Sequence, residues 1–190
     1  MRNALVSIIA PIYKYYPILV HSLQAQTHKN WELILIHDSP NQELYDLIKT
    51  INDTRIKYMW TEERYNDWGH SLREIALQHI SQESEFVVIT NADNYYVPIF
   101  IEEMLAGFKD NTVATYCNML HSHKRWDVIH AGLQCGKIDC GCVMVRKNIV
   151  LEFGWKYRDF GADWGFIRDV IQKYGGESFL KVNKILFVHN

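Results

Sequence analysis

The chain has 190 residues, of which 48% are hydrophobic, and its formal net charge is −2. This composition predicts one packed domain and excludes a disordered chain. No basic stripe indicates a nucleic-acid-binding face, no apolar stretch is long enough to span a bilayer, and the N-terminus lacks the apolar core of a signal peptide. We therefore expect a cytoplasmic protein with no transmembrane segment and no nucleic-acid partner.

The four cysteines have no paired CxxC spacing; they are Cys117, Cys135, Cys140 and Cys142. We interpret them as buried, reduced thiols, in keeping with a cytosolic protein. A zinc site that combines some of them with a histidine stays open as an alternative.

The first half of the chain alternates short apolar runs with helical stripes. The runs predict strands at Leu5–Ala10, Trp31–Ile36, Arg55–Trp60 and Phe86–Thr90. Helices are expected at Pro17–Gln26 and over the stripes Leu44–Ile51 and Leu72–Ile80. Ser39 reads as a helix cap, with Pro40 at the first helical position. Runs without polar alternation are typical of parallel strands that helices cover on both faces.

The second half is less regular. Helical stripes cover Ile101–Phe108 and Ile167–Tyr174, and Gly175 stops the second one. Strands are expected at Val113–Cys117, Gly141–Val145 and Ile185–Val188. The whole pattern predicts an α/β fold, a three-layer sandwich with a central, mostly parallel sheet and helices on both faces.

Polar residues follow the predicted strands, and in open α/β sheets ligands bind at these strand ends. The positions are Pro11–Tyr13, His37-Asp38, Trp60–Glu62, Asn91–Asn94 and His189. Neither GxGxxG nor GxxxxGK[ST] occurs. A diphosphate bound here would therefore need a divalent metal held by carboxylates to offset its charge.

Several segments together resemble glycosyltransferase family 2, whose fold is the Rossmann-like GT-A type. They are Val6–Tyr13, Ser22–Thr27, Trp31–Ser39, Gly141–Lys147, and Thr90–Asn94 at the place of the DxD motif. The resemblance runs with gaps from Val6 to His189. It implies a single catalytic domain over 1–190, with a nucleotide-binding half at about 1–95 and an acceptor and catalytic half at about 96–190.

The resemblance also implies roles for individual residues. Asp38 would contact the nucleotide base in a pocket lined by Pro11 and Tyr13, with Arg73 nearby. Asn91 would bind the ribose. Asp93 would hold the metal on the diphosphate, with His189 as a further ligand. Asp163 would act as the catalytic base.

The implied reaction moves a sugar from a nucleoside-diphosphate donor, UDP-linked, to a carbohydrate or other hydroxyl acceptor. A divalent cation, Mn²⁺ or Mg²⁺, would offset the charge on the departing diphosphate. A single base on the opposite side of the sugar implies an in-line displacement and inversion. Association with a second copy or a partner subunit stays open.

Other interpretations remain beside these. Asn91 replaces the first acid of the DxD motif, so a non-catalytic sugar-nucleotide-binding domain is one alternative, and a nucleotidyltransferase is another. Asp93 could be a turn residue, Asp38 could close a strand end, and Asp163 could cap the last helix. Arg73 could be a solvated helix residue, and the penultimate His189 could be frayed.

Overall fold

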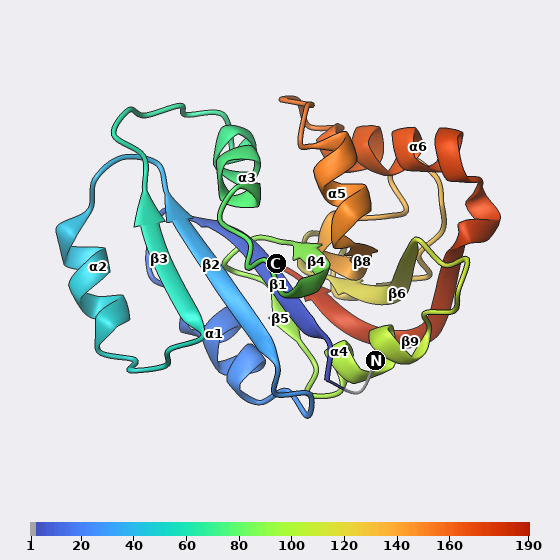
Figure 1. Ribbon diagram of the computed structural model, residues 1–190, viewed down its shortest axis with the longest axis horizontal. Coiled ribbons are helices and arrows are strands. Elements are labelled where there is room, and N and C mark those ends of the chain that lie inside the picture. Colours follow the sequence, from blue (N-terminus) through green and yellow to red (C-terminus); the bar gives the residue numbers. More distant parts are fainter. Residues whose placement is uncertain (1–2) are drawn as a thin grey trace.

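The computed structural model describes residues 3–190, and over these residues nine strands form one mixed sheet (Figure 1). The order across the sheet is β3-β2-β1-β4-β8-β6-β9-β5, and β7 pairs with β6. The strands are β1 (Leu5–Ile12), β2 (Trp31–His37), β3 (Ile56–Trp60), β4 (Ser84–Ile89), β5 (Tyr95–Tyr96), β6 (Ala114–His121), β7 (Asp127–Ile129), β8 (Val143–Arg146) and β9 (Phe179–His189).

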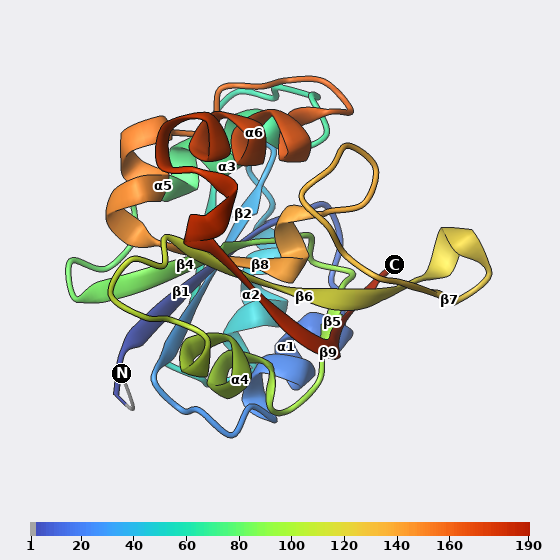
Figure 2. The same cartoon turned by 90° about the vertical axis from the view of Figure 1, so that its right-hand side faces the viewer.

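Helices cover both faces of the sheet, as the three-layer prediction requires. They are α1 (Pro17–Gln24), α2 (Gln42–Lys49), α3 (His70–Leu77), α4 (Phe100–Ala106), α5 (Lys147–Phe153) and α6 (Ala162–Tyr174). In Figure 2, α3, α5 and α6 lie above the sheet, whereas α1 and α4 lie below it. The α/β prediction is therefore confirmed.

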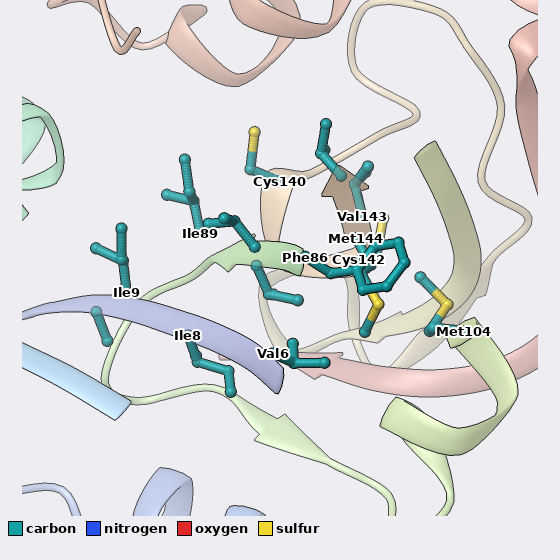
Figure 3. Packing of buried hydrophobic residues seen from close by; sticks show 14 of the residues in the cluster. Val6, Ile8, Ile9, Phe86, Ile89, Met104, Cys140, Cys142, Val143 and Met144 are labelled. Atoms are coloured by element: carbon teal, nitrogen blue, oxygen red, sulfur yellow. The ribbon is translucent and has the colours of Figure 1, made fainter. Parts of the chain in front are cut away.

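The first four strands in the order pair in parallel. The largely apolar, buried sequences of β1, β2 and β4 are typical of that arrangement, whereas β3 at the edge of the sheet is only partly buried. Ile8 of β1 lies opposite Leu33 of β2 on one side and Val88 of β4 on the other. All three side chains are fully buried, and burying each contributes about 1.5–3 kcal/mol. Figure 3 shows the core continuing from β1 and β4 to Cys142 and Met144 at the other half of the sheet.

Beyond β4 the sheet becomes mixed. Strand β8 is antiparallel to both β4 and β6, whereas β9 runs parallel to β6 and antiparallel to β5. The sequence patterns did not predict β5, β7 or α5. Strands β5 and β7 have only two and three residues, which is too short for a pattern to stand out, and α5 follows β8 with no loop between them.

The predicted cap Ser39 is wrong, and the alternative interpretation of Asp163 as a helix cap does not hold either. Helix α2 begins at Gln42, and its cap is Asn41, whose side chain accepts a hydrogen bond from the amide of Leu44 at 2.9 Å. Ser39 has a positive φ of 106° and lies in the loop. Helix α6 follows Gly161, so Asp163 stands inside its first turn and is not the cap.

The four cysteines are free thiols, and three of them are buried. Burial raises the pKa of the Cys117 thiol to about 12 and also raises the pKa values of Cys140 and Cys142. The prediction is wrong for Cys135, which is exposed in the loop before Asp139. Among residues 3–190, none of the helices combines the length and the apolar character needed to cross a bilayer.

Candidate active site

A cleft of about 730 Å³ opens at the carboxyl ends of β1, β2 and β4. Its volume is in the range of small-molecule binding sites. Five of the predicted nucleotide-binding residues line it together: Pro11, Tyr13, Asp38, Asn91 and Asp93. These residues are brought together because parallel strands end at one edge of the sheet.

Asp38 organises one wall of the cleft. Its two carboxylate oxygens accept hydrogen bonds from the backbone amides of Tyr65 and Asn66, both at 2.7 Å. Asp38 directly follows β2, so this contact holds the connection between β3 and α3 over the strand ends. Arg64, Asn66 and Trp68 of that connection also line the cleft, and the Trp68 side chain is 82% exposed.

Gly69 lets the same connection pass close to the end of β1. Its φ is +81°, a conformation that residues with a side chain rarely adopt. A Cβ atom placed there would lie 2.7 Å from the Cβ of Pro11. Only glycine fits at this point without displacing Pro11, which is itself part of the cleft.

Arg73 lies behind the cleft and is 7% exposed. Its guanidinium donates hydrogen bonds to the Trp68 carbonyl, at 3.1 Å, and to the side-chain oxygen of Asn91. Burial lowers its pKa, and the charge of Asp163 opposes that effect. The arginine therefore supports two cleft residues from beneath and is not a solvated helix residue.

Asp93 lines the cleft, and strand pairing brings the segment that carries His189 close to the segment of Asp93. The pairing of Tyr95 with Val188 aligns their segments, and the amide of Asn190 donates to the side chain of Asn94 at 3.0 Å. Atom Oδ1 of Asp93 and atom Nδ1 of His189 are both buried without a hydrogen-bond partner. Burial lowers the pKa of His189, although the charge of Asp93 acts to raise it.

Asp163 lies beyond His189 and pairs with a second acid, Asp139. The Cys140 amide donates to Oδ2 of Asp163 at 3.2 Å, and the charge of Asp139 acts on the Asp163 carboxyl group. Burial, together with the charge of Asp139, raises the pKa of Asp163 to about 7. Burial also raises the pKa of Asp139.

The sequence did not single out Asp139 or two histidines of the same region. Oδ2 of Asp139 lies 3.5 Å from Nε2 of His189, so the acid connects His189 to Asp163. The His121 ring stacks on His189 with 4.2 Å between centroids, and His123 lies 6.2 Å from His189. Two features of the sequence could have pointed to these residues. Asp139 stands just before a run of small residues, and His121 and His123 form a His-x-His pair at a strand end.

The residues present fit a divalent cation in part. No group of three or more His, Cys, Asp or Glu side chains within residues 3–190 is arranged to hold a metal ion. Asp93 and His189 nevertheless offer one unpartnered oxygen and one unpartnered nitrogen, on segments that the pairing of Tyr95 with Val188 brings together. Mg²⁺-type sites commonly use one or two protein ligands, with substrate phosphates and water completing the shell.

The sheet order, the covering helices and the cleft at the strand ends define a GT-A glycosyltransferase fold. The sequence model described as Glycosyl transferase family 2 matches residues 7–174, and the chain belongs to that family.

Known proteins agree with this assignment. An uncharacterized glycosyltransferase of Rickettsia bellii is 26% identical over 133 residues, which are 68% of this chain and 18% of that protein. Staphylococcus aureus TarS 1–349 in complex with UDP has a TM-score of 0.74 at 17% identity, covering 96% of this chain and 59% of that one. The mannosyltransferase PcManGT of Pyrobaculum calidifontis, in complex with GDP-Man and Mn²⁺, has a TM-score of 0.72 at 14% identity, covering 97% and 56%. The chain thus spans about a fifth of the first relative's length.

Proposed function

We propose that this domain is an inverting glycosyltransferase that takes a sugar from a nucleoside-diphosphate donor, UDP-linked, and transfers it to a hydroxyl acceptor. One observation carries the proposal. Asp93, which has an unpartnered carboxylate oxygen, lines the same cleft as Asp38 and acts electrostatically on His189 and Asp139, the neighbours of Asp163. These groups extend from the proposed nucleotide pocket at Asp38 to the buried acid Asp163.

The donor nucleotide would occupy the cleft between Pro11, Tyr13 and Asp38. Two backbone amides already orient the Asp38 carboxylate, so its remaining lone pairs face a defined direction and can accept hydrogen bonds from a base. Asn91 is held by Arg73 and would present its amide group to the ribose. The known complexes of TarS with UDP and of PcManGT with GDP-Man support a nucleotide donor.

The diphosphate would lie against Asp93 and His189, which would hold a divalent cation. Bound there, the cation supplies Lewis-acid stabilisation of the negative charge on the leaving diphosphate. Asp93 brings the only carboxylate of the Thr90–Asn94 motif, because Asn91 is uncharged. Its buried oxygen has no competing partner within the described part of the chain. The Mn²⁺ complex of PcManGT supports this use of a metal.

Asp163 would accept the proton of the acceptor hydroxyl. A base works best when its pKa lies near the working pH, and the value of about 7 meets that condition. The Cys140 amide fixes one oxygen of the carboxylate. A base on the far side of the sugar from the leaving diphosphate gives a single displacement with inversion.

Mn²⁺-dependent binding of UDP tests the proposal directly. We expect calorimetry to show tighter UDP binding with Mn²⁺ in the wild type, and Asp93→Ala to lose that enhancement. Asp110→Ala removes an exposed acid outside the cleft and should leave it unchanged. Equal UDP affinity with and without Mn²⁺ in the wild type would contradict the metal's role.

Turnover distinguishes an enzyme from a non-catalytic binding domain, the alternative that the uncharged Asn91 leaves open. An enzyme should release UDP from a UDP-sugar in the presence of Mn²⁺, and Asp163→Asn should lose this release while it still binds UDP. Binding of UDP-sugars by the wild type with no release of UDP, across a panel of donors and acceptors, would favour the binding domain.

A further inference from the structure

The carboxylate of Asp139 touches residues on both sides of the candidate site. Its Oδ1 accepts a hydrogen bond from the Gly141 amide at 2.7 Å, which fixes the side chain at the start of the turn η2 (Cys140–Cys142). Its Oδ2 lies 3.5 Å from Nε2 of His189, and its charge acts on the carboxyl group of Asp163. The Asp139 side chain is only 20% exposed, so water competes weakly for these contacts.

The proximity of Asp139 favours a proton on the nitrogen of His189 that faces it, 3.5 Å away. A neutral imidazole has one N–H and one lone pair, and a neighbouring acceptor favours the tautomer with the proton on the nitrogen that faces it. A carboxylate beside Nε2 thus leaves the lone pair on Nδ1. That atom is buried and has no partner, while the ring is held by stacking on His121.

We propose that Asp139 is a positioning residue that holds His189 in the Nε2–H tautomer, so that Nδ1 is directed with Asp93 toward the divalent cation. The part about the cation rests on the proposed function, whereas the part about the tautomer does not. Carboxylates that orient a metal-binding histidine in this way typically change metal affinity by about 10–100-fold.

Asp139→Asn separates this role from a purely structural one. The Asn oxygen can still accept from the Gly141 amide and keep the turn. The amide NH₂ then faces Nε2 as a donor, which reverses the polarity of the contact and favours the Nδ1–H tautomer. Asp127→Asn is the matched control, since Asp127 is exposed on β7 opposite His121 and, within residues 3–190, forms no hydrogen bond or ion pair with His189.

The first measurement needs no metal and no substrate. Long-range ¹H–¹⁵N NMR of histidine-labelled protein, with His189 assigned from a His189→Gln variant, reports the protonated nitrogen. We expect Nε2–H in the wild type and in Asp127→Asn, and a shift toward Nδ1–H in Asp139→Asn. An Nδ1–H tautomer in the wild type would overturn the proposal, even if the Asn variant failed to fold.

The second measurement is Mn²⁺ binding in the presence of UDP, followed by EPR. We expect the Kd for Mn²⁺ to rise about 10–100-fold in Asp139→Asn, to stay unchanged in Asp127→Asn, and to rise no further when Asp139→Asn is added to His189→Gln. Equal affinity in the wild type and Asp139→Asn would overturn the inference. A wild type that binds no Mn²⁺ would instead remove the metal from the proposed function, and the tautomer would then be judged from the NMR alone.

Discussion

Replacing Gly69 with alanine tests the close approach between the β3–α3 connection and the end of β1. At the φ of +81° an ordinary side chain costs about 1–2 kcal/mol. The new Cβ would also lie 2.7 Å from the Cβ and 2.9 Å from the Cγ of Pro11, and overpacking of this kind costs a further 1–3 kcal/mol or so. Together we expect a loss of about 2–5 kcal/mol in the free energy of unfolding, measured by urea titration. For a chain of this length that corresponds to roughly 4–20 °C in Tm.

Gly136→Ala is the matched control for this prediction. Gly136 has a φ of +75°, and a Cβ there would meet no atom within 4 Å. It should therefore lose only the backbone part, about 1–2 kcal/mol. Gly69→Ala should also weaken UDP binding because Pro11 lines the cleft, whereas Gly136→Ala should not. Equal losses of stability in the two variants would refute the steric argument.

Three further predictions concern the charged groups. Asp163→Asn should lower the rate of sugar transfer by about 10²–10⁴-fold with little change in the Kd for UDP, and an unchanged rate would remove Asp163 as the base. Folding raises the pKa of Asp163 from 3.8 to about 7, so between these values the native protein keeps a proton that the unfolded chain has released. In metal-free protein, the free energy of unfolding should therefore fall as the pH rises from about 4 to about 7. Asp163→Asn should lose that pH dependence in urea titrations, and an identical pH profile would contradict the raised pKa. Arg73→Met should leave the Trp68 carbonyl and Asn91 unpaired, at about 1–3 kcal/mol each, and should weaken UDP binding in calorimetry; full UDP affinity would contradict its supporting position.

The parallel half of the sheet could be predicted because three of its strands, β1, β2 and β4, are largely buried on both faces. Unbroken apolar runs such as Leu33–Ile36 are visible in the sequence, and the residues that follow such runs must lie at one edge. This reasoning placed Asp38 and Asp93 near each other, and they line one cleft. The periodic patterns also gave three helices, α2, α3 and α4, to within a few residues of their observed bounds.

The other half depends on pairings that local patterns do not encode. Asp139 contacts His189, which is 50 positions further along the chain, and that contact requires β6, β8 and β9 to pair in a particular register. Likewise, His121 meets His189 only because the two residues end paired strands. The burial of Arg73 could not be predicted either, because its partners Trp68 and Asn91 come from two separate loops.

The distribution of the thiols has a practical consequence for studying this domain. Three cysteines are buried with raised thiol pKa values, and such thiols react slowly with electrophiles. Cys135 is exposed and stands four residues before Asp139. A maleimide-linked fluorophore or nitroxide should therefore attach at one position of the unmodified protein, on the same loop as the carboxylate that faces His189. That gives a built-in labelling site from which the arrival of nucleotide or a paramagnetic ion could be followed without engineering the chain.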